Sequence, residues 1–177
     1  MSLSRLSCLI LLNAAVFAPS LAGAAGTQPE ILGVFKNWAA YTTETGDSKV
    51  CYALSRPTST EPRKVRRGPT FFLINDWPGR KAKGEPEIVP GYPYKDGSSV
   101  TVKVGADTIT FFTKNEGGAG GAWVEAQADE QKLVDAMKGA PEAVVTGTSK
   151  RGTVVRDTYP LAGFADALEK AHQACGM

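Results

Sequence analysis

The chain has 177 residues, of which 20 are Lys or Arg, 18 are Asp or Glu and one is His, so its net charge is only +2. This near-neutral balance argues against nucleic-acid binding, which needs a concentrated basic surface. The single histidine excludes a Ser-His-Asp triad and a histidine-rich metal site, and we expect neither a metal nor another cofactor.

The first 24 residues have the pattern of a secretory signal peptide. Arg5 precedes an apolar run over residues 6–17, and Pro19 and the small residues 22–24 follow. The run is shorter than the roughly 20 residues that cross a bilayer, and no later segment is apolar enough to do so. We therefore predict a cleaved leader at 1–24 and a mature chain at 25–177 that folds as one domain in the periplasm or outside the cell.

Cleavage after residue 24 would remove Cys8 and leave two cysteines, Cys51 and Cys175. In an oxidising compartment two cysteines permit one intramolecular connectivity, so we predict a disulfide between them. Two free thiols or an intermolecular bond are the alternative.

Short segments rich in β-branched and aromatic residues recur about every ten residues, which predicts a mainly β fold, an antiparallel β-sandwich or barrel-like domain. The clearest hairpin joins 100–104 to 108–113, with Val100, Val102 and Val104 on its buried face. A second hairpin is predicted to turn at 149–152, between 143–148 and 153–156. The strands that we predict are 38–43, 50–55, 70–75, 100–104, 108–113, 122–126, 143–149 and 153–159.

Two short helices complete the prediction. Asp129 is the expected N-cap of a helix that ends at Lys138 and Gly139. The last helix begins soon after Pro160 and carries an apolar stripe that places Cys175 inward. His172 lies one residue off that stripe, so we expect it to be exposed.

Three segments are predicted as irregular. Residues 57–69 and 77–93 are rich in proline and cations and are expected to form surface loops. Residues 117–121, which are four glycines and an alanine, are interpreted as a flexible connection. They are not a phosphate-binding loop, because no Gly-Lys-Ser/Thr sequence or helix follows.

Seven segments stand in a characteristic order along the chain: 35–41, 49–57, 91–94, 121–123, 133–137, 147–152 and 161–175. Taken together they resemble the invasion-associated locus B family of secreted or periplasmic bacterial proteins. The family is named for a member implicated in the entry of a pathogen into host red cells, and it has no established catalytic residue, cofactor or substrate. The resemblance implies an exported accessory protein, with Trp38 and Trp123 as core anchors and Cys51 and Cys175 as the bridge.

The candidate binding residues are four cations within five positions of the first loop: Arg63, Lys64, Arg66 and Arg67. Together they could hold a sulfated or phosphorylated glycan, another anionic envelope component or an acidic protein face. Basic runs are also often only solvated. A groove shared with Tyr92 to Tyr94 would favour binding over solvation, because tyrosines offer flat surfaces to sugars.

The alternative function is a periplasmic carbohydrate-active or other hydrolase. Two of the loop carboxylates Glu85, Glu87, Asp96 and Asp107 would then form an acid/base pair. Nothing in their spacing requires such a pair, so we expect a protein that is not an enzyme.

Overall fold

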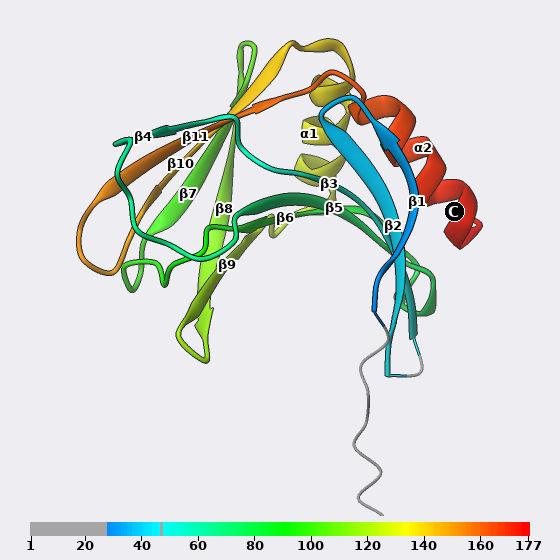
Figure 1. The fold of residues 1–177 in the computed structure, drawn as a ribbon, viewed down its shortest axis with the longest axis horizontal. Helices are drawn as coiled ribbons and strands as arrows, with labels where there is room; N and C mark the ends of the chain where they lie inside the picture. The colour runs from blue at the N-terminus through cyan, green and yellow to red at the C-terminus, as the bar shows by residue number, and fades with distance from the viewer. Residues whose placement is uncertain (1–27, 47) are drawn as a thin grey trace, which may run out of the picture.

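The computed structural model describes residues 28–46 and 48–177, and in them one antiparallel sheet carries two helices (Figure 1). The predicted leader and Cys8 lie outside the described residues. The 11 strands run in the order β1-β2-β3-β5-β6-β9-β8-β7-β10-β11-β4, and the sheet is not closed. A mainly antiparallel β fold with two helices, the last at the C-terminus, is therefore confirmed; its strands lie in a single bent sheet.

The strands follow each other along the chain with short connections. Their bounds are β1 (Glu30–Phe35), β2 (Trp38–Thr45), β3 (Ser48–Ser55), β4 (Ser59–Glu61), β5 (Phe71–Trp77), β6 (Ala82–Val89), β7 (Ser99–Val104), β8 (Asp107–Glu116), β9 (Ala119–Trp123), β10 (Glu142–Thr148) and β11 (Val154–Pro160). A 3-10 turn, η1 (Pro78–Arg80), precedes β6, and the helices are α1 (Gln127–Gly139) and α2 (Phe164–Cys175). Within the described part of the chain neither helix is long and apolar enough to cross a membrane.

The core lies between the sheet and the two helices. Strand alternation places Ala40, Ala53 and Ile74 at paired positions on one face, and all three are fully buried. Helix α2 packs over this part of the sheet with Phe164 and Leu168, while α1 contacts β6, β7 and β8. In Figure 1 both helices lie on the same side of the strands β3, β5 and β6, and within residues 28–46 and 48–177 no helix covers the other face.

Both predicted hairpins are present. Strands β7 and β8 form an antiparallel pair that starts at Val104 and Asp107, next to the turn. Val100, Val102 and Val104 are buried, as their alternation with polar residues predicts. Strands β10 and β11 pair in the same way on either side of the turn at residues 149–152.

Two segments predicted to be irregular contain strands. Strand β6 lies inside the expected loop 77–93, where buried Pro86 and Ile88 alternate with half-buried Glu85 and Glu87. Proline and glycine are rare in central strands. Because β6 contains both, its alternation of buried and half-buried residues was not recognised as a strand in the sequence. The short strand β4 lies within the expected loop 57–69, and strand β1 was not predicted from the sequence either.

The glycine-rich segment is a strand and not a flexible connection. Residues 117 and 118 turn with positive φ, and β9 follows from Ala119 to Trp123. A Cβ on Gly120 would stand 2.5 Å from the carbonyl oxygen of Tyr92, and one on Gly121 would stand 2.2 Å from the ring of Trp123. Gly120 and Gly121 therefore allow the backbone of Tyr92 and the ring of Trp123 to pack directly against β9.

Helix α1 begins two residues before the expected cap. Its N-cap position is Ala126, and Asp129 lies in the first turn beside Glu130, where a negative charge favours the helix dipole. Leu133, Val134 and Met137 are buried, as the apolar spacing predicts.

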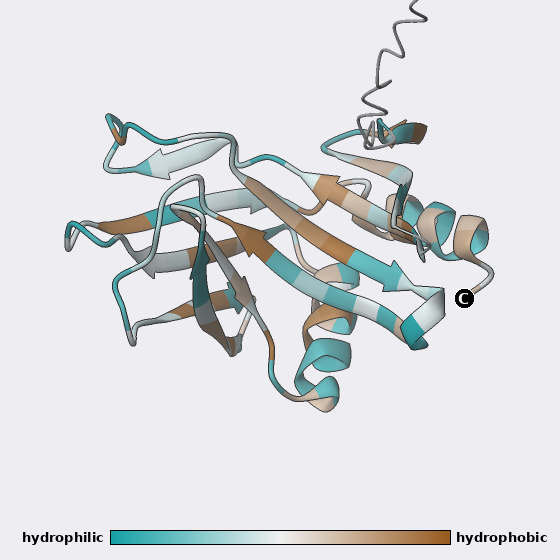
Figure 2. Cartoon of the chain, turned by 90° about the horizontal axis from the view of Figure 1, so that it is seen from below, coloured by the Kyte–Doolittle hydropathy of each residue, from teal (hydrophilic) through white to brown (hydrophobic). Residues whose placement is uncertain are grey.

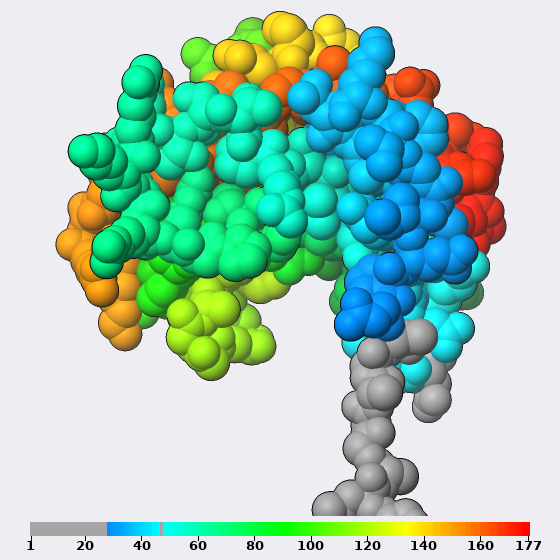
Figure 3. Space-filling view, in the orientation of Figure 1, coloured from blue at the N-terminus to red at the C-terminus, as the bar shows by residue number. Residues whose placement is uncertain are grey.

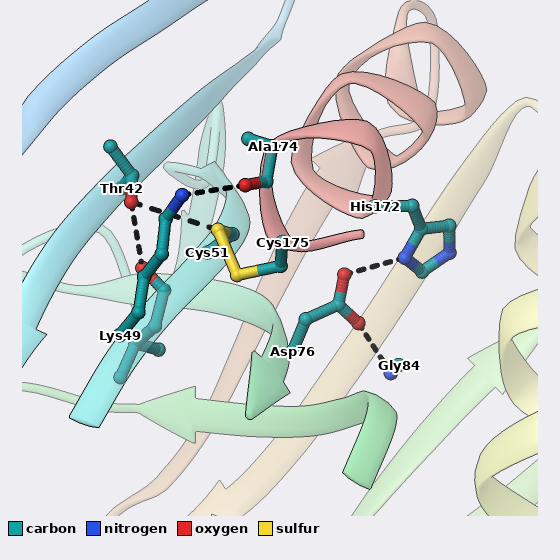
Figure 4. The surroundings of a disulfide bond; sticks show 9 residues. Thr42, Lys49, Cys51, Asp76, Gly84, His172, Ala174 and Cys175 are labelled. Carbon is teal, nitrogen blue, oxygen red and sulfur yellow. Dashed lines mark hydrogen bonds and ion pairs between the residues drawn. A yellow bond between two sulfur atoms is a disulfide. The ribbon is translucent and has the colours of Figure 1, made fainter. Parts of the chain in front are cut away.

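His172 is paired, and the expectation that it is exposed is wrong. Its side chain retains 14% exposure, and its Nδ1 lies 2.6 Å from Oδ2 of Asp76, which is fully buried on β5 (Figure 4). Asp76 also accepts a hydrogen bond from the backbone N–H of Gly84 at 2.8 Å. The position beside the apolar stripe faces β5, because α2 lies across β3 and β5.

The predicted disulfide between Cys51 and Cys175 is present (Figure 4). Its Cα atoms are 5.9 Å apart, and it joins α2 to β3 across 124 positions of sequence. Lys49 adds a second link, because its Nζ donates to the carbonyl oxygen of Ala174 at 2.6 Å. Both links secure the last turn of α2 against the sheet.

Replacing both cysteines with alanine should lower the free energy of unfolding by about 2–5 kcal/mol, because the bridge restricts a long loop in the unfolded chain. Urea unfolding of the oxidised protein measures this. A reductant should lower the stability of the wild type and leave the double variant unchanged. Equal stability of both proteins without reductant would contradict the prediction.

Candidate functional site

A groove with a volume of about 770 Å³ lies where three segments meet: residues 62–66, residues 91–93 and the turn between β10 and β11. Figure 3 shows the first segment and the orange turn next to each other at one end of the molecule. The groove's cations are Lys64 and Arg66 from the first segment and Lys150 and Arg151 from the turn.

Backbone contacts hold these segments together. The N–H of Gly68 donates to the carbonyl oxygen of Gly91 at 2.8 Å, which ties the end of the basic loop to the segment that carries Tyr92. Gly91 has a φ of +75°, and a Cβ there would stand 2.4 Å from the oxygen of Gly68, so only glycine fits. The N–H of Lys150 donates to the carbonyl oxygen of Pro93, which attaches the turn to the same segment.

The four cations predicted as one cluster separate into three roles. Lys64 and Arg66 line the groove, and Arg63 is exposed outside it. Arg67 points the other way: two of its nitrogens lie 2.6 and 2.7 Å from the carboxylate of Asp157, and the side chains are 9% and 6% exposed. The grouping of Arg67 with the ligand-binding cations is therefore not supported by its position.

Arg67 anchors the basic loop to the sheet. Its Nη2 also donates to Oγ1 of Thr60 on β4, and this hydroxyl donates to Asp157 on β11. Burial works to lower the pKa of Arg67, but its hydrogen bond to Asp157 and that residue's charge outweigh burial and raise the pKa above its usual value. The guanidinium stays charged and neutralises a buried carboxylate.

Tyr92 is the aromatic residue of the groove. Its ring meets that of Tyr94 edge to face at 5.5 Å, and Tyr94 itself is buried beneath it. The pKa of Tyr92 is raised to about 12, chiefly by burial and also by the charge of Asp157, while Arg67 opposes the rise. The phenol is therefore neutral at physiological pH.

The groove is electrostatically suited to an anion. Its four cations come from two segments that are more than 80 positions apart in the sequence. Within residues 28–46 and 48–177 none of the four takes part in an ion pair, and no carboxylate is among the residues that line the groove. Their like charges repel each other, so an anion that enters the groove relieves this repulsion.

The carboxylates proposed for hydrolysis are divided among several sites. Asp96 accepts a hydrogen bond from Asn115, and Asp107 pairs with Lys132 on α1. Glu85 and Glu87 lie two residues apart on β6. Among the residues that the structure describes, no group of three His, Cys, Asp or Glu side chains could hold a metal ion.

Sequence reasoning missed one part of the groove and one contact outside it. The sequence analysis assigned Lys150 and Arg151 to a hairpin turn and not to the binding site, although two adjacent cations in a turn are visible in the sequence. The contact between Asp76 and His172 had no signal in the sequence, because 96 positions separate the two residues.

The fold and the groove define a small antiparallel β domain whose C-terminal helix is disulfide-linked to its sheet and whose opposite end carries a basic groove. The family model described as invasion associated locus B (IalB) protein matches residues 38–172. The chain therefore belongs to the IalB family.

A solved structure has the same fold. The crystal structure of invasion associated protein B from Bartonella henselae aligns with a TM-score of 0.55 over 84% of this chain and 97% of that one. The two sequences are 14% identical, so the likeness concerns the fold. No curated protein sequence matches the chain.

Replacing Arg67 with glutamine should destabilise the protein by about 3 kcal/mol, because Asp157 would stay buried without a cation. Arg66→Gln, one position away and exposed, should change stability by less than about 0.5 kcal/mol. Urea unfolding of both variants provides the comparison. Equal losses in the two variants would show that Arg67 is not the anchor.

Proposed function

We propose that this chain is an exported, non-enzymatic binding protein whose basic groove holds an anionic glycan outside the cytoplasm. The convergence of Lys64, Arg66, Lys150 and Arg151 with Tyr92 on one groove carries the proposal. Its volume, about 770 Å³, is within the usual range for sites that hold small ligands, roughly 300–1,000 Å³.

Export is supported by two observations. Residues 1–24 have the order of charge, apolar run and small residues that a signal peptide shows. The Cys51–Cys175 disulfide belongs to the oxidising compartments that such a leader serves. The periplasm or the cell exterior is therefore the proposed location.

A role in contact with host cells is supported by the family description and by the name of the Bartonella protein, both of which refer to invasion. Sulfated and phosphorylated glycans are polyanions that a protein meets outside the cytoplasm. Four cations on opposite sides of a groove suit a ligand with several anionic groups along its length, since each group can find its own cation.

Replacing Lys64 and Arg66 together with glutamine should weaken binding of a heparin hexasaccharide about tenfold, since each lost contact between exposed charges is worth about 0.7 kcal/mol. Titration calorimetry at 50 mM sodium chloride measures the affinity. The wild-type affinity should fall at 300 mM, because salt screens exposed charges.

The matched control is the double variant Lys103→Gln/Lys170→Gln, which removes the same net charge from exposed positions outside the groove. It should bind nearly as well as the wild type. Equal weakening in both double variants, or an affinity that ignores salt, would count against the groove. Turnover of a glycan that Glu87→Gln abolishes would support the hydrolase instead.

A further inference from the structure

The sheet face opposite α2 carries a continuous row of half-exposed side chains. Strand register places Leu54, Leu73, Glu87, Trp123 and Phe112 next to one another on β3, β5, β6, β9 and β8. Directly paired residues point to the same face, so these side chains form one line across the strands. Figure 2 views the sheet from below, where the central strands lie in front of the helices.

Aromatic rings stand at the β8 end of this row. The side chain of Phe112 is 46% exposed, and its ring centroid lies 6.0 Å from that of Trp123. The Trp123 ring lies against Gly121, where a Cβ would stand 2.2 Å from it, so the glycine allows the indole to lie flat on the strand. A second aromatic pair stands at the other end, where Tyr41 and Tyr52 stack at 5.3 Å with an angle of 13°.

The middle of the face is polar. Asn75 donates a hydrogen bond to Glu87 at 2.9 Å, and the remaining carboxylate oxygen of Glu87 has acceptor capacity left. Burial raises the pKa of Glu87, although the hydrogen bond from Asn75 opposes this. A purely apolar partner would cover these polar atoms without bonding to them, which is costly.

Carboxylates outnumber cations around the aromatic end. A second groove of about 770 Å³ lies there, and its lining contains Arg80 paired with Glu85, Lys114 paired with Glu116, and two further carboxylates, Glu125 and Glu130. This groove therefore lacks the uncompensated positive charge of the basic groove. Its chemistry favours a ligand that carries both flat apolar surfaces and hydroxyl groups.

We propose that this face is a second binding surface, distinct from the basic groove, for an uncharged linear glycan. A pyranose ring combines an apolar face, which stacks on Trp123 or Phe112, with hydroxyls that can donate to the carboxylate of Glu87, which Asn75, itself only 3% exposed, holds in place. The row from β3 to β8 crosses four strand spacings, about 19 Å, so it suits several consecutive sugars.

The test uses the uncharged hexasaccharides of cellulose, of N-acetylated chitin and of laminarin as probes in titration calorimetry. At least one should bind, with the same affinity at 50 and 300 mM sodium chloride. Phe112→Ala should weaken it about fivefold, because it removes an exposed stacking surface. Val154→Ala, which trims another exposed apolar side chain on β11, should leave binding unchanged.

The double variant Lys64→Gln/Arg66→Gln separates the two proposals, since it should bind heparin about tenfold more weakly and bind the neutral probe with unchanged affinity. Failure of all three hexasaccharides to bind at millimolar concentration would overturn the second surface. So would equal effects of Phe112→Ala and Val154→Ala. Binding of a hexalysine peptide in place of the sugars, weakened by Phe112→Ala, would show that the face takes a cationic protein segment instead.

Discussion

The attachment of α2 to β3 and β5 decides how both faces of the sheet are used. The Cys51–Cys175 bridge and the buried contact of His172 with Asp76 act on adjacent turns of the same helix. They hold α2 against the face of the sheet that carries Ile74, so that the side chains on this face form the core. In the part of the chain that the structure describes, no helix covers the opposite face, because α2 is fixed on this one. Removing either link should therefore loosen the division between core and surface.

At the other end of the sheet a buried ion pair has a corresponding role. Arg67 and Asp157 join the basic loop to β11, and their burial uses one cation of the run for structure. Lys64 and Arg66 stay exposed to solvent and line the groove, because Arg67, which follows them, is anchored to Asp157. One short sequence thus supplies both a structural charge and two of the cations that line the basic groove. The two grooves differ in charge, which suits them to ligands of different chemistry.

Prediction succeeded where a pattern was local. The β7–β8 hairpin has alternating valines and a glycine turn, and the α2 stripe has helical spacing, so both follow from neighbouring residues. It failed at β6, where Pro86 and two glutamates obscure a strand that pairs on both sides. It also failed at Gly121, because the close approach of the Trp123 ring that requires a glycine exists only in the folded strand.

By itself the sequence determined the fold class, the pairing of Cys51 with Cys175 and the presence of a cationic loop, since composition, spacing and residue supply set these. Only the tertiary structure decided which cations are free, since Arg66 and Arg67 are adjacent in sequence but face solvent and Asp157 respectively. It also brought Lys150 to Lys64 and His172 to Asp76. The physical reason is that charge and hydrogen-bond partners act through space, over distances that linear order does not encode.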